Sequence, residues 1–507
     1  MASLRKYKWS GLLLGGFTLY FCFSALIAPF WGGNDTWSDL LPVVHYQNAI
    51  LKEHRLPLYT EQWYGGREQW KNPLWNFLYL PATLIWLVLP LDLATKIILI
   101  GHLLFSLFAG WKLASLFITK ELNRIFAAII FVSPSLPAYL AGHIENILSW
   151  GWILLALYFL LDEQSSAKKR GLGSGICFGI IPLTGSNYYT FYGFILIIPL
   201  LLALKNKTIL GFFAIGAAIG LLHLPSVAYM IGMERANTTS MLVQFRMNFL
   251  SILSSITIGY TLPLNWETWG CIGIGVIILW LKILWRKIKE LNNKTLLTDN
   301  KQLALCCSLI ILILFATGFI FHLTSLFDTF RIPARAIPFI ALNIFLYCLM
   351  SVQRGKSDLN VTFYLGVSAI QIILLAWLIR PIGSPYSYHD IGVRELGTLL
   401  KQDKAQDIWI NNQLPTNMNI DIGLTMLGFN LPNVYYGDMG QEVPVYGNRC
   451  GYAFDHIITA EDEELPILLK PNNEWQSFKI SMPKERLELV GRVKVNGLIY
   501  KVYRVKC

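Results

Sequence analysis

A carboxylate flanked by aromatic side chains follows the first long apolar segment of the chain. The stretch reads Trp31-Gly-Gly-Asn-Asp35-Thr-Trp-Ser-Asp39. A carboxylate can act as a general base that takes the proton from an attacking hydroxyl group. We therefore predict that Asp35, the carboxylate nearer the apolar segment, is the catalytic base, with Asp39 as the second candidate. The alternative interpretation is that both residues are helix caps or solvated loop charges.

Further polar groups stand where later apolar segments begin. Two arginines four residues apart, Arg331 and Arg335, share one face if a helix begins there. Their guanidinium groups are suited to the charge that develops on a phosphate leaving group. The predicted substrate-binding residues are His143, Glu145, Asn187, Tyr188, Arg331 and Arg335. In the alternative interpretation, the histidine and glutamate only finish a helix, and the arginines anchor the chain by reaching toward lipid headgroups.

The composition indicates lipid as the solvent for most of the chain. Of the 507 residues, 54% are hydrophobic and only 14% are charged, whereas a soluble domain carries roughly a quarter charged residues. The net charge of +11 comes from short basic clusters between apolar stretches, such as Lys168-Lys169-Arg170. Clusters of this kind mark cytoplasmic loops of membrane proteins, so we expect no binding of nucleic acid.

We predict a polytopic α-helical membrane protein with about eleven spans. The predicted spans are 9–30, 93–117, 125–141, 146–161, 172–185, 190–204, 208–231, 266–285, 303–322, 334–352 and 359–379. The apolar stretch 74–90 is interpreted as juxtamembrane or re-entrant, because counting it as a span would place most basic clusters outside. The N-terminus is then cytoplasmic and the C-terminus outside. Segment 9–30 is longer than a signal-peptide core, which favours an uncleaved anchor over a cleaved signal.

The composition changes near Arg380 and divides the chain into two predicted domains. Residues 1–381 form the membrane domain, with a long outer loop at 31–73, and residues 382–507 form an extracytoplasmic α/β domain. Strands are expected at 407–410 and 487–490, and a hairpin at 493–505 turns at Asn496-Gly497.

The cysteines support this division and give one predicted disulfide. Cys450 and Cys507 are the only cysteines after residue 381, and an oxidising compartment favours a bond between them. The alternatives are a free terminal thiol or a bond between molecules. No His/Cys set has zinc-binding spacing, and no phosphate-binding loop for a nucleotide occurs. We therefore predict no cofactor, and a divalent metal has no support.

Inside the predicted spans, small residues and two histidines are interpreted as packing groups. Gly216 and Gly220 have the small-xxx-small spacing that permits close approach of two helices. His102 and His223 are expected to be hydrogen-bonded core residues.

The order of several elements resembles the GT-C superfamily of membrane glycosyltransferases, especially its bacterial multispanning members. These elements are the acidic residue after the first span, Leu56-Pro57-Leu58, a Gly-Gly turn, Gly142-His143 and Arg331-Ile-Pro-Ala-Arg335. The resemblance covers roughly residues 9–380. It implies an inverting transfer of sugar from a polyprenyl-phosphate carrier to a glycan, lipid or protein acceptor outside the cytoplasm. It also implies a location in the bacterial inner membrane and a role in building the cell envelope.

Two other functions fit a protein of this composition. A transporter or flippase usually places ionisable residues deep within its spans, whereas Asp and Glu are absent from the interiors of the predicted spans. A non-catalytic cell-envelope assembly protein would keep the same layout of spans and outer domain. Both stay as alternatives to the glycosyltransferase.

Overall fold

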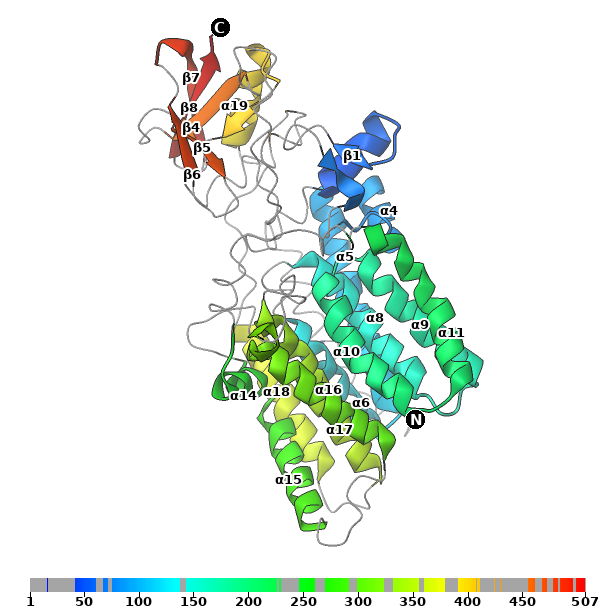
Figure 1. Ribbon diagram of the computed structural model, residues 1–507. Coiled ribbons are helices and arrows are strands. Elements are labelled where there is room, and N and C mark those ends of the chain that lie inside the picture. The colour runs from blue at the N-terminus through cyan, green and yellow to red at the C-terminus, as the bar shows by residue number, and fades with distance from the viewer. Residues whose placement is uncertain are drawn as a thin grey trace, which may run out of the picture.

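The chain is mostly helical and carries a small sheet, as a computed structural model shows (Figure 1). The structure describes residues 42–60, 67–71, 75–136, 143–225, 246–259, 270–290, 299–322, 332–354, 360–378, 391–406, 408–410, 455–460, 467–471, 477–481, 484–495 and 498–506, and the single residues Gly16, Ala228, Leu424 and Phe429.

Twelve of the helices in the described residues form one helical body. They are α4 (Leu80–Val88), α5 (Leu91–Ser115), α6 (Glu121–Val132), α8 (Ile144–Leu161), α9 (Ala167–Leu183), α10 (Asn187–Ala203), α11 (Lys207–Ala217), α14 (Phe249–Ile258), α15 (Ile274–Glu290), α16 (Asn300–Ala316), α17 (Ile337–Arg354) and α18 (Val361–Leu378). Short 3₁₀ turns extend some of them, including η4 (Ala218–His223), which follows α11, and η9 (Pro333–Ala336), which precedes α17.

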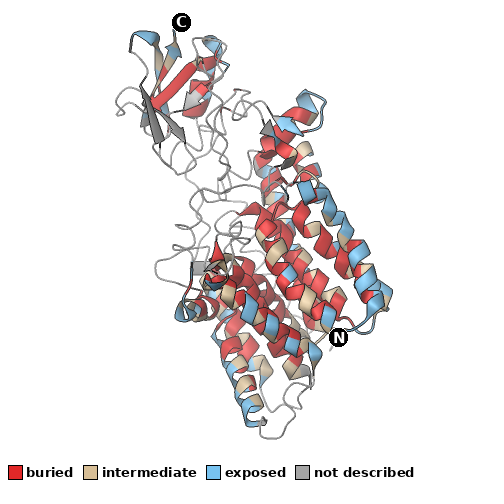
Figure 2. Ribbon diagram, in the orientation of Figure 1, coloured by how far each residue is buried: buried red, intermediate tan, exposed pale blue. Residues whose placement is uncertain are grey.

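Within the described residues, three helices are long and apolar enough to cross a membrane: Leu93–Ser115, Ile144–Leu161 and Pro333–Val352. Other apolar helices are shorter, such as Asn187–Ala203 and Asn300–Ala316. Large apolar side chains are exposed along the helical body, among them Phe108, Ile215 and Leu281. Figure 2 shows exposed positions along α11 and α15. A water-soluble monomer rarely exposes so much contiguous apolar surface. The helices therefore indicate a helical membrane protein.

Most predicted spans coincide with helices of the structure. Segment 74–90 contains α4, whose nine residues extend about 13 Å, far less than the roughly 30 Å of a bilayer core. That this stretch does not cross the membrane stays a prediction. Segment 9–30 lies outside the described residues apart from Gly16, and the total of eleven spans stays a prediction.

The helical body differs from the prediction in the start of one helix and in one additional helix. The helix expected at 266–285 begins at Ile274. Gly273, directly before it, has a positive φ of 83°, which lies outside the right-handed helical region, so the helix does not extend back through this residue. The helix α14 was not predicted. It begins after Asn248, whose side chain accepts from the backbone N–H of Ser251, and ends at Gly259 in the left-handed region.

Helices α9 and α11 approach each other closely through glycines. A Cβ atom on Gly175 would lie 2.2 Å from the carbonyl oxygen of Phe213, and one on Gly171 would lie 2.4 Å from that of Ile209. From the other side, a Cβ on Gly216 would lie 2.7 Å from the carbonyl oxygen of Leu172. The small-residue spacing predicted for Gly216 and Gly220 is therefore a packing feature, and α9 supplies matching glycines.

We expect Gly175→Ala to destabilise the protein, because the added methyl group overlaps a backbone oxygen that cannot move alone. Overpacking of this kind costs typically 1–3 kcal/mol, so the thermal midpoint of the detergent-solubilised protein should fall by several degrees. Gly211→Ala is the matched control, since its Cβ would meet no atom within 4 Å. Equal midpoints for the two variants would contradict the close approach of α9 and α11.

The basic clusters gather at one end of the helical body. Three short connections, each between two packed helices, lie at the same end as the C-terminus of α15 (Figure 1). They are residues 116–120, 162–166 and 204–206. We call this the basic end. Lysines here lie over aromatic rings, with Lys168 Nζ 5.5 Å from the ring centroid of Phe212 and Lys287 Nζ 5.0 Å from that of Tyr347. Paired basic and aromatic residues are typical of a membrane–water interface.

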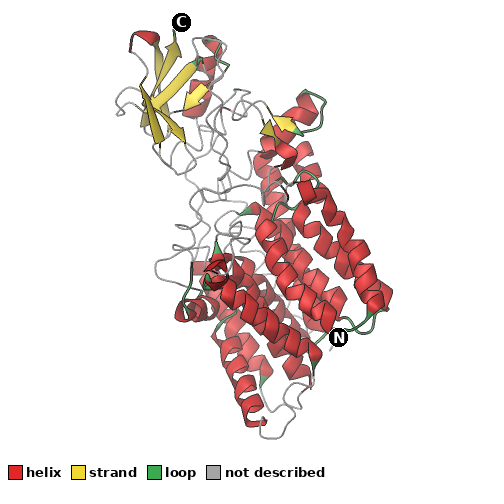
Figure 3. Ribbon diagram, in the orientation of Figure 1, coloured by secondary structure: helices red, strands yellow, loops and turns green. Residues whose placement is uncertain are grey.

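The small sheet belongs to the C-terminal part of the chain (Figure 3). Its strand order is β3-β4-β8-β7, formed by β3 (Ile408–Ile410), β4 (His456–Ala460), β7 (Leu487–Val495) and β8 (Leu498–Val505). A separate ribbon pairs β5 (Ile467–Pro471) with β6 (Ser477–Ser481), and the helix α19 (Ile391–Gln402) packs on β7. Buried side chains of α19 and the sheet, such as Leu396, Tyr500 and Val502, form the shared core.

The hairpin predicted from Asn496-Gly497 is confirmed by the pairing of Val495 with Leu498. The first strand of this hairpin begins at Leu487, so the predicted strands 487–490 and 493–495 are one strand. A register shift between Leu489 and Gly491 lets the strand continue. Cys450 and Cys507 lie outside the described residues, and their disulfide stays a prediction.

Candidate functional site

Five of the predicted binding residues lie where helices of the body begin. His143 directly precedes α8, Asn187 is the first residue of α10, and Arg335 belongs to η9. Helix α10 packs against both α8 and α17. The three starts lie at the end of the helical body opposite the basic end (Figure 1), and we call this the site end.

His143 and Glu145 form a buried pair at the start of α8. The Nδ1 atom of His143 lies 3.1 Å from Oε1 of Glu145, and each residue is only 5% exposed. The carboxylate stands in the first turn of the helix, where the helix dipole favours negative charge. The assignment of this buried pair to a binding site stays a prediction, as does the alternative that it only finishes the helix.

A hydrogen bond between the starts of α8 and α10 lies beside the pair of His143 and Glu145 in the sequence. Ser186 Oγ donates to Oδ1 of Asn146 over 2.7 Å, so the residue before α10 is tied to the first turn of α8. Thr184 Oγ1 lies 3.4 Å from the carbonyl oxygen of Glu145 and 2.7 Å from that of Ile181. Ser186 and Asn146 were not predicted as site residues, although both stand beside predicted ones in the sequence.

Arg335 and Tyr188 form the cationic part of the site. The guanidinium carbon of Arg335 lies 4.4 Å from the ring centroid of Tyr188, a geometry in which the ring attracts the cation. In general, a guanidinium group binds an anion through its N–H edges, and a ring can lie over its flat face at the same time. The contact therefore holds the guanidinium group of Arg335 beside the start of α10.

A buried aromatic cluster holds the three helices together beneath these residues. The rings of Trp150 and Tyr189 are 5.6 Å apart, and both contact Phe339 of α17 at 5.6 and 5.1 Å between centroids. The indole N–H of Trp150 donates to the carbonyl oxygen of Phe131 over 2.9 Å. Because α8, α10 and α17 share this cluster, the positions of His143, Tyr188 and Arg335 are coupled.

The described part of segment 31–73 packs against the helices. Strand β1 (Tyr59–Thr60) pairs with β2 (Arg67–Glu68), and Gln47 Nε2 donates to the carbonyl oxygen of Trp86 over 2.6 Å. Tyr46 is fully buried and its ring lies 5.3 Å from that of Phe77. The loop that carries the predicted carboxylates is therefore anchored on α4.

His45 lies in this loop and is 1% exposed. Burial, followed by the nearby charge of Arg55, lowers the pKa of His45 to about 4. The ring also contacts the backbone of Tyr59 through a hydrogen bond. His45 therefore stays neutral in the folded loop near neutral pH.

We expect the outer loop to lose stability as the pH falls from 6.5 toward 4. A histidine in the unfolded chain has a pKa of about 6.5, so below that pH the unfolded loop binds more protons than the folded loop. Between pH 7 and 5, hydrogen-exchange protection of residues 42–60, corrected for intrinsic rates, should fall about 20-fold. His45→Gln should remove this dependence, whereas His54→Asn, at an exposed position in the same segment, should retain it. An unchanged dependence in His45→Gln would contradict the assignment.

The two histidines predicted as packing groups are buried. His102 Nε2 lies 3.2 Å from the hydroxyl oxygen of Tyr79, which also accepts from the indole of Trp152 over 2.9 Å. His223 is 1% exposed and ends η4. The prediction of a hydrogen-bonded core residue is confirmed for His102, and for His223 its burial is confirmed.

The remaining predicted site residues, Asp35, Asp39 and Arg331, lie outside the described residues. Among the residues that the structure does describe, no group of three or more His, Cys, Asp or Glu side chains is arranged to hold a metal ion.

Comparison with known proteins gives no family assignment. The chain matches no protein-family model, and no curated protein is significantly similar to it. The function is therefore argued from the residues at the site end.

Proposed function

We propose that the protein is an inverting membrane glycosyltransferase that moves a sugar from a polyprenyl-phosphate carrier to an extracytoplasmic acceptor. The observation that carries this proposal is the cation–π contact of Arg335 with Tyr188, in which the guanidinium carbon lies 4.4 Å from the ring centroid. This contact places the guanidinium group of Arg335 beside the start of α10. The helical body around it carries many exposed apolar side chains. A lipid-linked phosphate needs this combination of an anion-binding group and a lipid-facing surface.

In the proposed reaction, an acceptor hydroxyl attacks the anomeric carbon of the donor sugar. The new bond joins the acceptor oxygen to that carbon, and the bond from the carbon to the phosphate oxygen breaks. The hydroxyl proton passes to the carboxylate of Asp35, which acts as the general base. The phosphodiester leaves as a phosphate monoester with more negative charge, and Arg335 and Arg331 stabilise this charge.

The buried pair of His143 and Glu145 is assigned to substrate binding, together with Asn187 and Tyr188. These residues lie on the ends of packed helices rather than on long loops, and such placement holds a binding group in a fixed position. The link between Ser186 and Asn146 keeps the two helix starts in register.

The proposed orientation places the basic end in the cytoplasm and the site end outside. Short cytoplasmic loops carry an excess of Lys and Arg, and the basic clusters gather at one end of the helical body. We expect reporter fusions at Lys169 and Lys287 to indicate the cytoplasm and a fusion at Tyr388 to indicate the outside. A cytoplasmic signal at Tyr388 would contradict the orientation and, with it, transfer outside the cytoplasm.

The activity itself is tested by incubating the purified full-length protein, in lipid nanodiscs, with a radiolabelled polyprenyl-phosphate sugar and envelope extract as the source of acceptor. Transfer of label from the lipid fraction to an acceptor supports the proposal. Movement of the intact sugar lipid between leaflets of proteoliposomes, without cleavage, would instead show a flippase. Binding without cleavage or movement would favour a non-catalytic assembly protein.

A further inference from the structure

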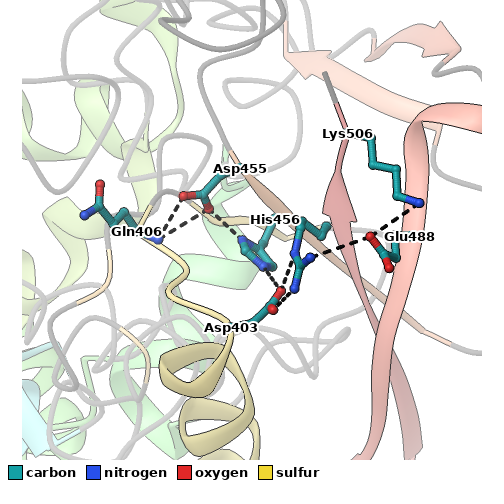
Figure 4. A network of polar contacts seen from close by, with 7 residues as sticks. Asp403, Gln406, Asp455, His456, Glu488 and Lys506 are labelled. Atoms are coloured by element: carbon teal, nitrogen blue, oxygen red, sulfur yellow. Dashed lines mark hydrogen bonds and ion pairs between the residues drawn. The ribbon is translucent and has the colours of Figure 1, made fainter.

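Charged side chains outside the proposed site differ in whether the protein itself matches them with opposite charge. The charges around the junction of α19 with the C-terminal sheet are matched (Figure 4). Asp403, which follows α19, accepts from Nε of Arg504 over 2.8 Å. Oε2 of Glu488 lies 3.4 Å from Nζ of Lys506. These pairs join α19 and the strands to one another.

The basic residues on the outer side of α15 are not matched in this way. Lys282, Arg286 and Lys289 are exposed, and no carboxylate that the structure describes pairs with any of them. The helix has four basic residues, and its one acidic residue is the last, Glu290. The end of α15 therefore carries positive charge that faces the surroundings.

These three basic residues form a row along one side of the helix. Their spacing of four and then three residues brings them onto neighbouring turns of one face, over a length of about 10 Å. A row of exposed apolar side chains runs beside them, formed by Ile274, Ile278, Leu281, Trp285 and Ile288. The two rows meet where Nζ of Lys289 lies 5.2 Å from the ring centroid of Trp285.

Helix α18 holds the inner end of the basic row in place. Nζ of Lys282 donates to the hydroxyl oxygen of Tyr364 and lies 4.9 Å from the centroid of its ring. The two helices are in close contact here, because a Cβ atom on Gly275 would overlap the carbonyl oxygen of Tyr364. Arg286 and Lys289 lie farther along the helix, toward its end, and are free of such contacts with α18 in the described part of the chain.

We propose that the last two turns of α15 bind an anionic phospholipid. Arg286 and Lys289 contact the phosphate of the headgroup, since guanidinium and ammonium groups donate strong hydrogen bonds to phosphate oxygens. The acyl chains lie along the apolar row toward Ile274. Basic groups at the membrane surface attract anionic lipids of the cytoplasmic leaflet, which the basic end faces in the proposed orientation. This site lies at the end opposite the proposed active site and does not depend on the proposed transfer reaction.

Native mass spectrometry of the full-length protein, stripped of lipid in detergent, tests this proposal. The protein is titrated with phosphatidylglycerol or with phosphatidylcholine of the same acyl chains, and the Kd of the first bound lipid is measured. The wild type should bind phosphatidylglycerol about 30-fold more tightly, the effect of two basic residues. Arg286→Gln with Lys289→Gln should lose this factor, and each single variant should lose about fivefold. The Kd of phosphatidylcholine should change little.

The matched control is Lys205→Gln with Lys207→Gln. It removes two exposed lysines from another connection of the basic end and should keep the preference of the wild type. An equal loss in this control would show attraction to the whole basic end and would overturn the proposal. Equal affinity of the wild type for both lipids would overturn it as well.

Two further outcomes would show a different occupant of this face. Glycerophosphoglycerol, the headgroup without acyl chains, should not compete at the same concentration, because it lacks the part that lies on the apolar row. Full competition would indicate a site for free phosphate esters and would overturn the proposal. A dimer of the chain that phosphatidylglycerol does not displace would show that a second copy covers α15, with the same consequence. If the double variant does not fold, the two single variants decide.

Discussion

Replacing Asp35 with asparagine should lower the rate of sugar transfer by about 10²–10⁴-fold, the usual contribution of a general base. The amide keeps the size of the side chain and some of its hydrogen bonds, but it cannot take a proton from the acceptor hydroxyl. The protein should still insert into the membrane, and binding of the donor should change little because the carboxylate acts on the acceptor. Label transfer from a polyprenyl-phosphate sugar under single-turnover conditions measures this effect.

Asp39→Asn is the internal control for Asp35. It removes the same charge four residues along the chain. Near-normal transfer by Asp35→Asn together with an inactive Asp39→Asn would move the base to Asp39. Normal transfer by both variants would exclude a carboxylate base in this stretch of the outer loop.

Replacing Arg335 with alanine should weaken binding of the lipid-phosphate donor and also slow the transfer step. Loss of one donor that stabilises developing charge lowers kcat by about 10²–10³-fold. Arg335→Lys keeps the charge but loses the flat guanidinium face and its paired donors, so its activity should be intermediate. Both kcat and the KM for the donor should change, in contrast to Asp35→Asn, where the change lies in the rate.

Two controls separate the role of Arg335 from a general effect of charge. Tyr188→Phe keeps the ring over which the guanidinium group lies and removes only the hydroxyl group, so it should weaken donor binding less than Arg335→Ala does. Lys289→Ala removes one positive charge at the basic end, where Lys289 lies over Trp285, and should leave donor binding unchanged. If Lys289→Ala weakens donor binding as much as Arg335→Ala does, the site is not at the site end.

The helices were largely predictable from the sequence because apolar composition over a bilayer-length window reflects a strong physical requirement. The helix α14 was missed since its ten residues are too few for that window, although Asn248 and Gly259 mark its two ends. The hairpin of β7 and β8 followed from the two-residue Asn-Gly turn, which fixes strand register locally.

The candidate site was predictable only where a local motif carried it. Arg335 could be found from its spacing to Arg331, and Glu145 from its closeness to His143. The bond of Ser186 to Asn146 joins residues 40 positions apart, and the contact of Asp403 with Arg504 spans 101 positions. Such pairs depend on which helices pack and which strands align, and one sequence does not contain that information in its local patterns.

The most direct test of the proposed function is a structure of the full-length protein with a non-hydrolysable polyprenyl-phosphate sugar bound. The proposal predicts that the phosphate lies at the site end, within hydrogen-bond distance of the Arg335 guanidinium group. The anomeric carbon should face the carboxylate of Asp35, and the lipid chain should follow the apolar exterior of the helical body. A phosphate bound at the basic end beside Lys287 and Lys289, or a donor that contacts neither Arg335 nor Asp35, would contradict the proposal.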